Sequence, residues 1–384
     1  MSGLPSSAEV VVVGGGVIGV STAFHLAEAG VRDVLLIERD SLASGSTSRA
    51  AGGVRAQFSD ELNIAIALRS LEAFAGFAIR PGAEIDLRQV GYLFLLDRAA
   101  DVATFERSIT LQNALGVPSR IIDVAEAGRL CPLAGLSGVL AATYCPIDGH
   151  ASPEAVVQGY AVAARAHGAQ LETDCALRAI DVDGGEIVAV ETTKGRIETG
   201  TVVCAAGVLS RPVAALVGVA LPVDPVKRQV WFTEPAPDLP DVVPFTIDFT
   251  SGLYFHREGP GLLFGMADRD QLPGFDAEVD PARLERVSEV AERRVPRLAE
   301  LGIQGGWTGY YEVTPDHNAL IGEVAGVSRF LYATGFSGHG FLQGPAVGEI
   351  VRDLVLGRPP FVDVAPLAVE RFAGTRMRPE YNII

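Results

Sequence analysis

The chain is short of lysine and rich in acidic residues, and this balance excludes one class of partner. Lys194 and Lys227 are the only lysines among 31 basic residues, and 47 acidic residues give a formal net charge of −16. A surface that binds nucleic acid needs clustered basic side chains, which this sequence lacks. We therefore expect no nucleic-acid partner.

The chain also has few cysteines and no long apolar run. Its cysteines, Cys131, Cys145, Cys175 and Cys204, show neither CxxC spacing nor a metal-ligand pattern, which predicts reduced thiols and no metal site. No run of 18 apolar residues could span a bilayer, and the opening residues, MSGLPSSAE, lack the basic region of a signal peptide. We expect a soluble, cytoplasmic protein without a transmembrane segment.

What the sequence does contain is clearest between residues 10 and 40. Four valines at 10–13 predict a strand buried on both faces, and the run GGGVIG follows directly. Apolar residues then recur at helical spacing over 17–29, and 34–37 predicts a second strand that ends at Glu38. This order is typical of a dinucleotide site, with a glycine turn that serves packing alone as the alternative.

Each residue of this turn has a physical task in such a site. Gly14 permits the tight turn, Gly16 lets the backbone approach a pyrophosphate, and Gly19 lets helix and strand pack closely. The unpaired N–H groups of the helix N-terminus then face the phosphates, and Glu38 can accept the hydroxyl groups of an adenosine ribose. The candidate cofactor-binding residues of this segment are Gly14, Gly16, Val17, Ile18, Gly19, Glu38 and Arg39.

Two further segments are candidates for cofactor contacts. Residues 41–53, SLASGSTSRAAGG, form a long loop of small residues, which fits a ligand-wrapping segment as well as an ordinary flexible loop. Residues 201–207, TVVCAAG, predict a buried strand that stops in small residues, either at the ligand-binding edge of the sheet or against a helix. The candidates are Gly45, Ser46, Thr47, Arg49, Gly52, Gly53, Leu177, Ala205, Ala206 and Gly207, and Arg49 has a structural role as its alternative.

The remaining pattern predicts a layered α/β chain with a second sheet. Helices are expected after Ser59 or Asp60 and over 101–115, 121–130, 153–167, 281–301 and 345–356. Strands over 170–172, 177–183, 187–192 and 196–198 are expected to form a β-meander. Strands over 223–234, 244–249, 253–257 and 261–266 are expected to form a separate antiparallel sheet.

Several segments together resemble one known superfamily. The opening unit, GSTSRAAGG, TVVCAAG, TPDHNALIG and ATGFSGHGF are similar to the FAD-dependent amine and amino-acid oxidoreductases of the D-amino-acid oxidase superfamily. The chain most resembles its L-proline dehydrogenase and heterotetrameric sarcosine oxidase β subunits. The resemblance implies an α/β fold, in which a Rossmann-like FAD-binding domain of the glutathione-reductase type carries an antiparallel-sheet α+β substrate domain. The implied FAD-binding domain is 1–85, 147–221 and 305–384, and the implied substrate domain is 86–146 and 222–304.

The resemblance also implies oxidation of a carbon–nitrogen bond. Hydride transfer to a flavin needs no protein nucleophile, but the substrate must be placed over the ring and its carboxylate held. Arg55 stands ten residues after Gly45, where monomeric sarcosine oxidases carry a carboxylate-binding arginine, and a surface salt bridge is the alternative. Tyr254 and His256 alternate on one strand and share a face, and Tyr254 matches a substrate-contacting tyrosine of the family.

The later segments complete the expected site. Tyr310 and Tyr311 lie on a strand aimed at the flavin with opposite-facing side chains, so we expect one of them in the pocket. His339 lies in the GHG loop, where we expect it near the pyrimidine end of the flavin, with a polar structural role as the alternative. The cofactor candidates from this loop are Gly338, His339, Gly340, Phe341 and Leu342, and the catalytic candidates are Arg55, Tyr254, His256, Tyr311 and His339.

Departures from the family pattern sharpen this expectation. Leu342 and Leu263 occupy the places of the substrate-binding and the oxygen-activating lysine of monomeric sarcosine oxidases, which favours a dehydrogenase that passes electrons to a partner or quinone. Gly309 replaces the cysteine that anchors FAD there, so we expect non-covalent FAD. Pro153 replaces the FMN-binding histidine of sarcosine oxidase β subunits, as in L-proline dehydrogenase β subunits, which leaves open a non-covalent FMN at an α/β subunit interface.

The leading hypothesis is a FAD-dependent dehydrogenase for a small, secondary amino acid such as L-proline, sarcosine or hydroxyproline. One alternative is an oxygen-using oxidase of sarcosine, glycine or a D-amino acid. Another is a flavin-carrying subunit that is active only with a partner, either an α subunit or an electron acceptor. An NAD-dependent dehydrogenase would account for the first motif alone and leaves the GSTSRAAGG and GFSGHGF segments unexplained.

Overall fold

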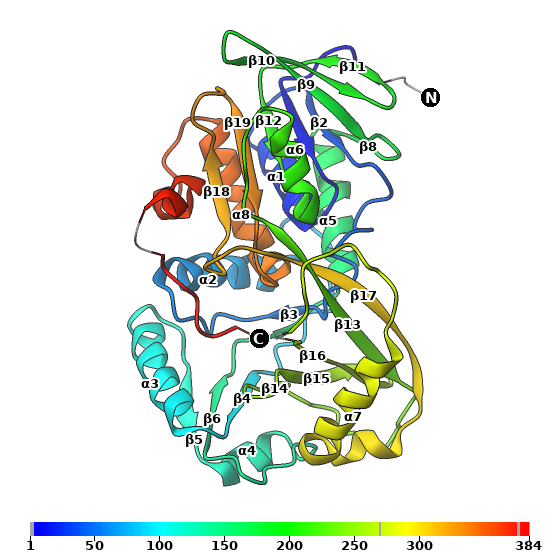
Figure 1. The fold of residues 1–384 in the computed structure, drawn as a ribbon, viewed down its shortest axis with the longest axis vertical. Coiled ribbons are helices and arrows are strands. Elements are labelled where there is room, and N and C mark those ends of the chain that lie inside the picture. Colours follow the sequence, from blue (N-terminus) through cyan, green and yellow to red (C-terminus); the bar gives the residue numbers. More distant parts are fainter. Residues whose placement is uncertain (1–3, 269, 375–376, 384) are drawn as a thin grey trace.

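The computed structural model describes residues 4–268, 270–374 and 377–383, which form two halves stacked along the long axis of the molecule (Figure 1). The upper half is built around a six-stranded sheet and the lower half around an eight-stranded sheet. Residues 1–3, which begin the stretch predicted not to be a signal peptide, lie outside the described part.

The six-stranded sheet carries the predicted dinucleotide-binding unit. Its strands, in spatial order, are β18 (Leu320–Glu323), β19 (Phe330–Thr334), β12 (Val202–Cys204), β1 (Val10–Val13), β2 (Val34–Ile37) and β8 (Gln170–Glu172). All neighbours run parallel except β18 and β19. The carboxyl ends of β1, β2 and β12 therefore meet at one edge, where ligands bind in sheets of this kind.

Both faces of this sheet are covered, which explains why its strands are runs of apolar residues. Val10 and Val12 pack on the side of the helices, whereas Val11 and Val13 pack against a second sheet. The helices are α1 (Val17–Glu28), α5 (Pro153–Ala166) and α8 (Gly340–Val355), with α2 (Glu61–Ala75) packed on α8. The second sheet consists of β9 (Leu177–Asp183), β10 (Glu186–Thr192) and β11 (Gly195–Glu198).

The predicted β-meander is wrong at its first strand. β8 pairs in parallel with β2 and extends the six-stranded sheet, so that only β9, β10 and β11 form the meander. A three-residue strand carries too little pattern to identify its partner, because strand preference depends on the neighbours against which the side chains pack.

The eight-stranded sheet forms the lower half. Its strands, in spatial order, are β17 (Ile303–Val313), β13 (Asp224–Thr233), β16 (Gly261–Met266), β15 (Leu253–Glu258), β14 (Phe245–Asp248), β4 (Tyr92–Leu96), β6 (Ala141–Cys145) and β5 (Arg120–Ile122). The sheet is antiparallel apart from β4 and β14, which run parallel because they come from distant parts of the chain with no hairpin between them. β17 belongs to this sheet by pairing, although the predicted FAD-binding domain resumes at residue 305, so the predicted domains share this strand.

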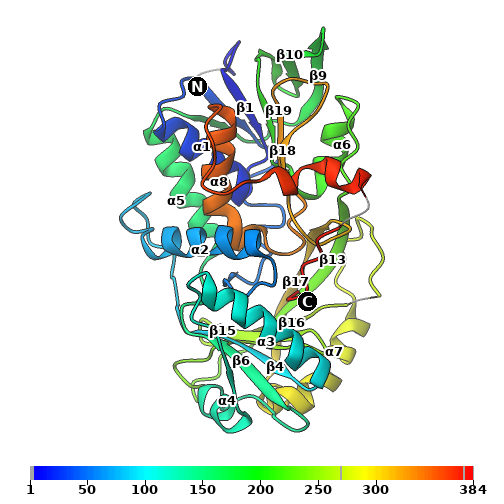
Figure 2. The same cartoon turned by 90° about the vertical axis from the view of Figure 1, so that its left-hand side faces the viewer.

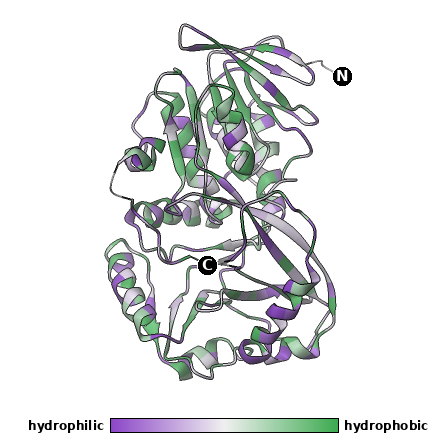
Figure 3. Ribbon diagram, in the orientation of Figure 1, coloured by the Kyte–Doolittle hydropathy of each residue, from purple (hydrophilic) through white to green (hydrophobic). Residues whose placement is uncertain are grey.

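The two faces of the lower sheet have different neighbours. One face packs against α4 (Val124–Leu130) and α7 (Pro281–Arg294), and the residues of α7 are mostly hydrophilic (Figure 3). The other face carries Tyr92, Phe94, Phe245 and Tyr254 and packs in part against α3 (Ala99–Ala114). This aromatic face is the one that turns toward the upper half.

Three predicted helices have other boundaries in the structure. Residues 121 and 122 belong to the edge strand β5, and α4 starts only after Asp123, whose carboxylate accepts a hydrogen bond from the Glu126 N–H at 2.7 Å. The predicted helix 281–301 ends at Arg294, because Pro296 has no N–H to continue it. The helix expected from Pro345 starts five residues earlier, so that the proline lies inside α8 rather than in its first turn.

The remaining elements are short. They are the short pair β3 (Gly53–Val54) and β7 (Gly149–His150), α6 (Ser210–Ala215) and the 3-10 turns η1 (Gly207–Leu209), η2 (Pro296–Glu300), η3 (Ala365–Leu367) and η4 (Val369–Ala373). α2 lies along the boundary between the halves in both views (Figures 1 and 2). Within the described ranges, no helix combines the length and the apolar character needed to cross a membrane.

Candidate cofactor and substrate site

A cavity of about 890 Å³ lies where the two halves meet. Its upper wall is formed by the carboxyl ends of β1, β2 and β12 and the start of α1, and its lower wall by β4, β13, β14 and β15. All the predicted site residues line this cavity except Gly19 and His256. The fold thus brings together segments from both ends of the chain, and their contacts with a bound cofactor remain predictions.

Close packing requires glycine at two positions of the turn after β1. Gly14 has a φ of +114°, and a Cβ there would lie 2.3 Å from the carbonyl oxygen of Ala205. A Cβ on Gly19 would lie 1.9 Å from the carbonyl oxygen of Gly14, which explains why Gly19 serves helix packing and lies off the cavity. Gly16 is the residue before α1 and does line the cavity. The exposed N–H groups of this helix start suit a pyrophosphate.

Glu38 follows β2 and is tied to the same turn. Its Oε2 accepts a hydrogen bond from the Gly15 N–H at 2.7 Å, and its Oε1 accepts one from the Asp40 N–H at 2.9 Å. Each carboxylate oxygen has a further lone pair and can accept a second hydrogen bond. The residues present therefore fit the adenosine ribose of a dinucleotide.

The loop 41–53 is held against the start of α1. The hydroxyl of Thr47 accepts a hydrogen bond from the Val17 N–H at 3.1 Å, and the Ala43 N–H donates to the carbonyl oxygen of Gly15 at 2.9 Å. The second half of the loop lines the cavity. This arrangement supports the predicted wrapping segment over an unattached loop.

Arg55 is a buried cation that pairs with no carboxylate among the described residues. Its guanidinium donates to the carbonyl oxygens of Gln57 and, at 2.7 Å, of Asn382, and its carbon lies 4.1 Å from the ring centroid of Phe58. The side chain is 5% exposed and lines the cavity, so the alternative of a surface salt bridge is wrong. A planar guanidinium in this position matches the two oxygens of a carboxylate ligand.

His339 stands beside Arg55 as a neutral hydrogen-bond acceptor. Its Nε2 lies 3.3 Å from Arg55 Nη2, and its ring meets Phe58 edge-on with the centroids 4.9 Å apart. Burial, and then the charge of Arg55, lowers the pKa of His339 well below its usual value. Because a guanidinium only donates, Nε2 must accept, and the ring proton lies on Nδ1. His339, the residue before α8, thus orients the Arg55 side chain.

Tyrosine side chains form much of the lower wall. Tyr254 on β15 stacks with Phe245 at a centroid distance of 5.9 Å, and burial raises its pKa well above the usual value. Tyr311 packs on Gly338, where an added Cβ would lie 2.5 Å from the tyrosine ring. The expectation that only one of Tyr310 and Tyr311 reaches the pocket is wrong, since both line the cavity from the edge strand β17.

His256 lies outside the cavity, which corrects its predicted catalytic role. It shares a face of β15 with Tyr254, as expected, and both rings stack with Phe245. Its Nδ1 lies 2.8 Å from the carbonyl oxygen of Arg257, and its Nε2 lies 3.0 Å from that of Ala51. Strand alternation predicts the face of a residue but not how far along the strand the cavity extends. His256 therefore ties β15 to the wrapping loop.

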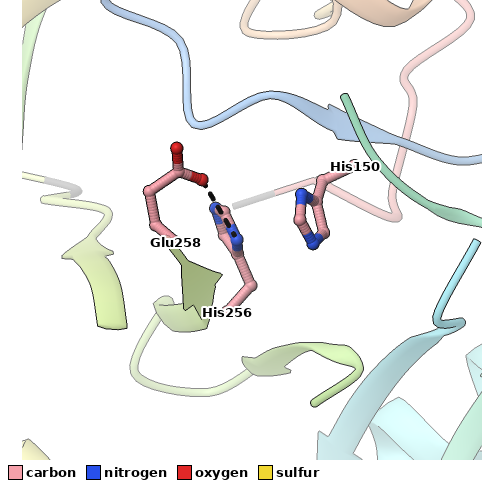
Figure 4. Close-up of side chains that lie close together, drawn as sticks. All are labelled: His150, His256 and Glu258. Carbon is pink, nitrogen blue, oxygen red and sulfur yellow. Dashed lines mark ion pairs between the residues drawn. The ribbon is translucent and has the colours of Figure 1, made fainter. Parts of the chain in front are cut away.

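His150 and Glu258 accompany His256 (Figure 4). The ligand atoms of these three residues lie within 4.8 Å of one another, as in a loose metal site. Both ring nitrogens of His256 already face carbonyl oxygens, and Glu258 is exposed. The cluster is therefore not arranged around an ion.

Several cavity residues escaped the sequence prediction. Arg228 on β13 lies with its guanidinium carbon 4.8 Å from the ring centroid of Tyr311. Tyr92 on β4 stacks with Phe245 at 4.4 Å, and Asn382 reaches the cavity from the C-terminal segment. The alternation of residues 228 and 230 places both on one face of β13, but the sequence does not say which face meets the cavity. No local signal marks Asn382.

The residues that depart from the family pattern lie in different parts of the structure. Leu342 lines the cavity, whereas Leu263 is buried in the aromatic face of the lower sheet and lies off the cavity. A Cβ on Gly309 would lie 2.9 Å from Cβ of Arg49, so this strand leaves little room for a cysteine. Pro153 starts α5 next to the capping residue Ser152.

Comparison with known proteins covers both halves. Residues 9–354 match the family described as DAO, FAD dependent oxidoreductase. The mitochondrial dimethylglycine dehydrogenase of Mus musculus is 31% identical over 386 residues, which is 95% of this chain and 44% of that protein. FAD-dependent oxidoreductase domain-containing protein 1 of Bos taurus is 30% identical, covering 96% of this chain and 85% of its own length. The chain thus spans less than half the length of the dimethylglycine dehydrogenase.

Solved structures show the same arrangement of the two sheets. L-proline dehydrogenase from P. horikoshii has a TM-score of 0.92 and 36% identity, covering 98% of this chain and 100% of that one. Glycine oxidase from Geobacillus kaustophilus has a TM-score of 0.86 and 27% identity, covering 96% and 99%. Together with the glycine turn, Glu38 and the cavity between the sheets, these matches show that the chain belongs to the FAD-dependent oxidoreductase family and that its cofactor is FAD.

Proposed function

We propose that the chain is a FAD-dependent dehydrogenase that oxidises the C–N bond of a small, secondary amino acid such as L-proline, sarcosine or hydroxyproline. The observation that carries this proposal is Arg55, a buried guanidinium that lines the cavity without a carboxylate partner in the described part of the chain. Relatives named sarcosine dehydrogenase and L-proline dehydrogenase support this class of substrate.

Bound FAD supplies the acceptor for a hydride. The residues of the chain bind and orient the substrate: Arg55 holds the carboxylate, His339 keeps Arg55 in place, and Tyr254 and Phe245 exclude water from the lower wall. The substrate must react as its neutral amine, and the nearby guanidinium charge favours loss of the amine proton. Loss of the hydride from Cα and of a proton from nitrogen leaves an imine.

The dehydrogenase part of the proposal depends on two leucines. Leu263 stands where the resemblance to monomeric sarcosine oxidases implies the oxygen-activating lysine, and Leu342 where it implies the substrate-binding lysine. Neither uncharged side chain can stabilise negative charge on reduced oxygen. We infer that electrons leave FAD for a protein partner or a quinone. A non-covalent FAD, an FMN at an α/β subunit interface and a cytoplasmic location complete the proposal.

An anaerobic titration of the purified flavoprotein tests this function. We expect L-proline, sarcosine or hydroxyproline to bleach the flavin absorbance under nitrogen, and we expect turnover with a dye acceptor to exceed turnover with oxygen alone. Comparable turnover in air without the dye would replace the dehydrogenase with an oxidase. A flavin that no amino acid in the series reduces would contradict the proposed function of the chain alone and would favour a flavin-carrying subunit that needs a partner.

A further inference from the structure

We propose that the substrate carries a second carboxylate, which Arg228 binds at the lower wall of the cavity. This inference rests on the proposed function and narrows its substrate class to amino acids with two carboxylates. Arg228 and Arg55 come from distant segments of the chain, and both line the same cavity.

Arg228 is half-buried and has few polar contacts for a charged group. Its Nη1 donates to the carbonyl oxygen of Lys227 at 3.1 Å, and its buried Nε has no hydrogen-bond partner. No described carboxylate lies within ion-pair distance, in contrast to neighbouring Lys227, whose ammonium is paired with Asp276. The guanidinium plane of Arg228 is therefore available to an anion from the cavity.

The surroundings of Arg228 point to a ligand rather than to the protein. Burial lowers the pKa of Arg228, and the groups acting in the opposite direction are the phenols of Tyr311 and Tyr254, not acids. Glu312 also lines the cavity, but its Oε2 accepts hydrogen bonds from Thr334 Oγ1 at 2.8 Å and from the Gly335 N–H at 3.1 Å. An arginine keeps its charge under these conditions, so the cation is left uncompensated.

The position of Arg228 places it on the substrate side of the cavity. Arg228 and Val230 alternate along β13 and share the wall with Tyr254 and Phe245 of the lower sheet, whereas the glycine turn and Glu38 lie on the upper sheet. Tyr311 is close enough to both arginines to feel their charges. Burial raises the pKa of its phenol, and the charges of Arg228 and then of Arg55 act in the opposite direction.

Two guanidinium groups in one cavity, of which Arg55 is buried and Arg228 half-buried, favour a dianion. A substrate with one carboxylate would pair with Arg55 and leave the half-buried Arg228 without an anion. A substrate with a second carboxylate, on the nitrogen substituent or on the side chain, can pair one carboxylate with Arg55 and the other with Arg228. The class that fits is a secondary amine with two carboxylates, such as an N-carboxyalkyl or N-methyl dicarboxylic amino acid.

Two thioethers test the binding step without chemistry. Thiodiacetate has two carboxylates and methylthioacetate has one, and neither has an amine that can be oxidised. We expect thiodiacetate to perturb the flavin absorbance of the holoenzyme with a dissociation constant at least tenfold below that of methylthioacetate at constant ionic strength. Equal affinities would overturn the inference.

Arg228 variants assign the difference to this side chain. Arg228→Met should reduce the thiodiacetate preference to less than twofold, and Arg228→Lys, which keeps the charge but not the planar fork, should retain part of it. Arg165→Met on the exposed surface of α5 is the matched control and should keep the wild-type preference. A full preference in a folded Arg228→Met protein would contradict the inference, and if that variant does not fold, an unchanged preference in Arg228→Lys would do the same.

Turnover then separates this inference from the proposed function. Anaerobic flavin reduction is compared for sarcosine, N-ethylglycine and iminodiacetate. N-ethylglycine has a methyl group at the position where iminodiacetate has its second carboxylate. Faster reduction by iminodiacetate supports both. Reduction by sarcosine and N-ethylglycine with no gain from iminodiacetate, N-methylaspartate or N-methylglutamate removes the inference and leaves the proposed function. If thiodiacetate binds through Arg228 but no amine reduces the flavin, the proposed function is contradicted and the dicarboxylate site is not.

Discussion

Arg55 makes its protein hydrogen bonds with neutral groups, which leaves its charge for a ligand. We predict that Arg55→Met lowers kcat/KM for the amino-acid substrate by roughly 100-fold, because a charge-assisted hydrogen-bonded pair contributes up to about 3 kcal/mol. Arg55→Lys should recover part of this loss. Stopped-flow flavin reduction measures the effect, with Arg165→Met as control and thermal unfolding to confirm that each variant folds. An unchanged kcat/KM in Arg55→Met would show that the carboxylate binds elsewhere.

A second single residue, Asp148, leads us to predict a pH dependence of the unfolding free energy. This fully buried carboxylate accepts hydrogen bonds from the Ala56 N–H at 3.0 Å and from Gln57 Nε2 at 3.1 Å, yet burial raises its pKa from 3.8 to about 7. The folded state therefore binds the proton more tightly than the unfolded state, so stability is highest below pH 4 for this group and falls as the pH rises toward 7. The slope approaches about 1.4 kcal/mol per pH unit.

Urea unfolding at pH 5 and pH 7 checks this prediction. The wild-type protein should lose more stability over this interval than Asp148→Asn, which cannot ionise. Asp183→Asn, at an exposed position of β9, should behave like the wild type. Parallel losses in the wild type and Asp148→Asn would show that other groups determine the pH dependence.

Single residues differ in how far the sequence predicts them. Arg55 could be placed because its distance from the GSTSRAAGG loop matches a known family pattern. Arg228 could not, because its place on the cavity depends on the pairing of β13 with β16 and β17, which the strand's own alternation does not determine. His256 has the correct face but lies beyond the end of the cavity.

At the scale of elements, the contact between α1 and the glycine turn is one of the tightest that a substitution can test. Gly19→Ala would place a Cβ 1.9 Å from a backbone oxygen, so the helix must shift away from β1. We predict a loss of roughly 3 kcal/mol in unfolding free energy, in the range of overpacked cores, together with weaker FAD retention. Gly200→Ala, where an added Cβ meets nothing within 4 Å, is the control. Thermal unfolding and the flavin content of the purified proteins measure both effects, and a Gly19→Ala protein equal to this control would contradict the prediction.

Elements whose signals are local were predicted correctly, and those that depend on partners were not. The unit from β1 to β2 has its strand, turn, helix and acid within one short, continuous stretch, each with its own pattern. β8 needed knowledge of its neighbour β2, which lies far from it in the sequence. The start of α8 was misplaced because proline usually occupies a first helical turn, whereas here Pro345 is accommodated inside the helix.

At the scale of the whole molecule, the C-terminal segment 377–383 is held at the boundary between the two halves. The buried carboxylate of Glu380 accepts hydrogen bonds from Ser59 Oγ at 2.6 Å, from the N–H groups of Ser59, Asp60 and Asn382, and from Asn63 Nδ2 at 3.0 Å. Apart from Asn382, these donors lie at the start of α2, along the boundary between the halves. Glu380 therefore fixes the segment beside the cavity.

We predict that Glu380→Gln destabilises the protein by about 2 kcal/mol, because one carboxylate oxygen becomes an amide group that faces donors. Glu106→Gln on the exposed side of α3 is the matched control and should have no effect. Thermal unfolding measures the difference. Equal stability of the two variants would show that the segment is held by its other contacts.

The architecture of two sheets around one cavity followed from the family resemblance and not from periodicity. Apolar alternation predicted strands over 223–266, but it could not show that β4, β5 and β6 join them in one sheet, since a long stretch of chain with other elements separates those strands from β13. The path of residues 377–383 across the cavity had no sequence signal, because its contacts are mostly polar groups of distant segments.

The contact of Asn382 with Arg55 is made by a peptide oxygen, and this has a consequence for genetics. Every amino acid carries that oxygen, so an alanine scan or a saturation library at position 382 would leave it intact and would report only on the buried side chain. A backbone ester in place of the following amide, which weakens the carbonyl as an acceptor without altering any side chain, would report the influence of this oxygen on substrate entry that such libraries overlook.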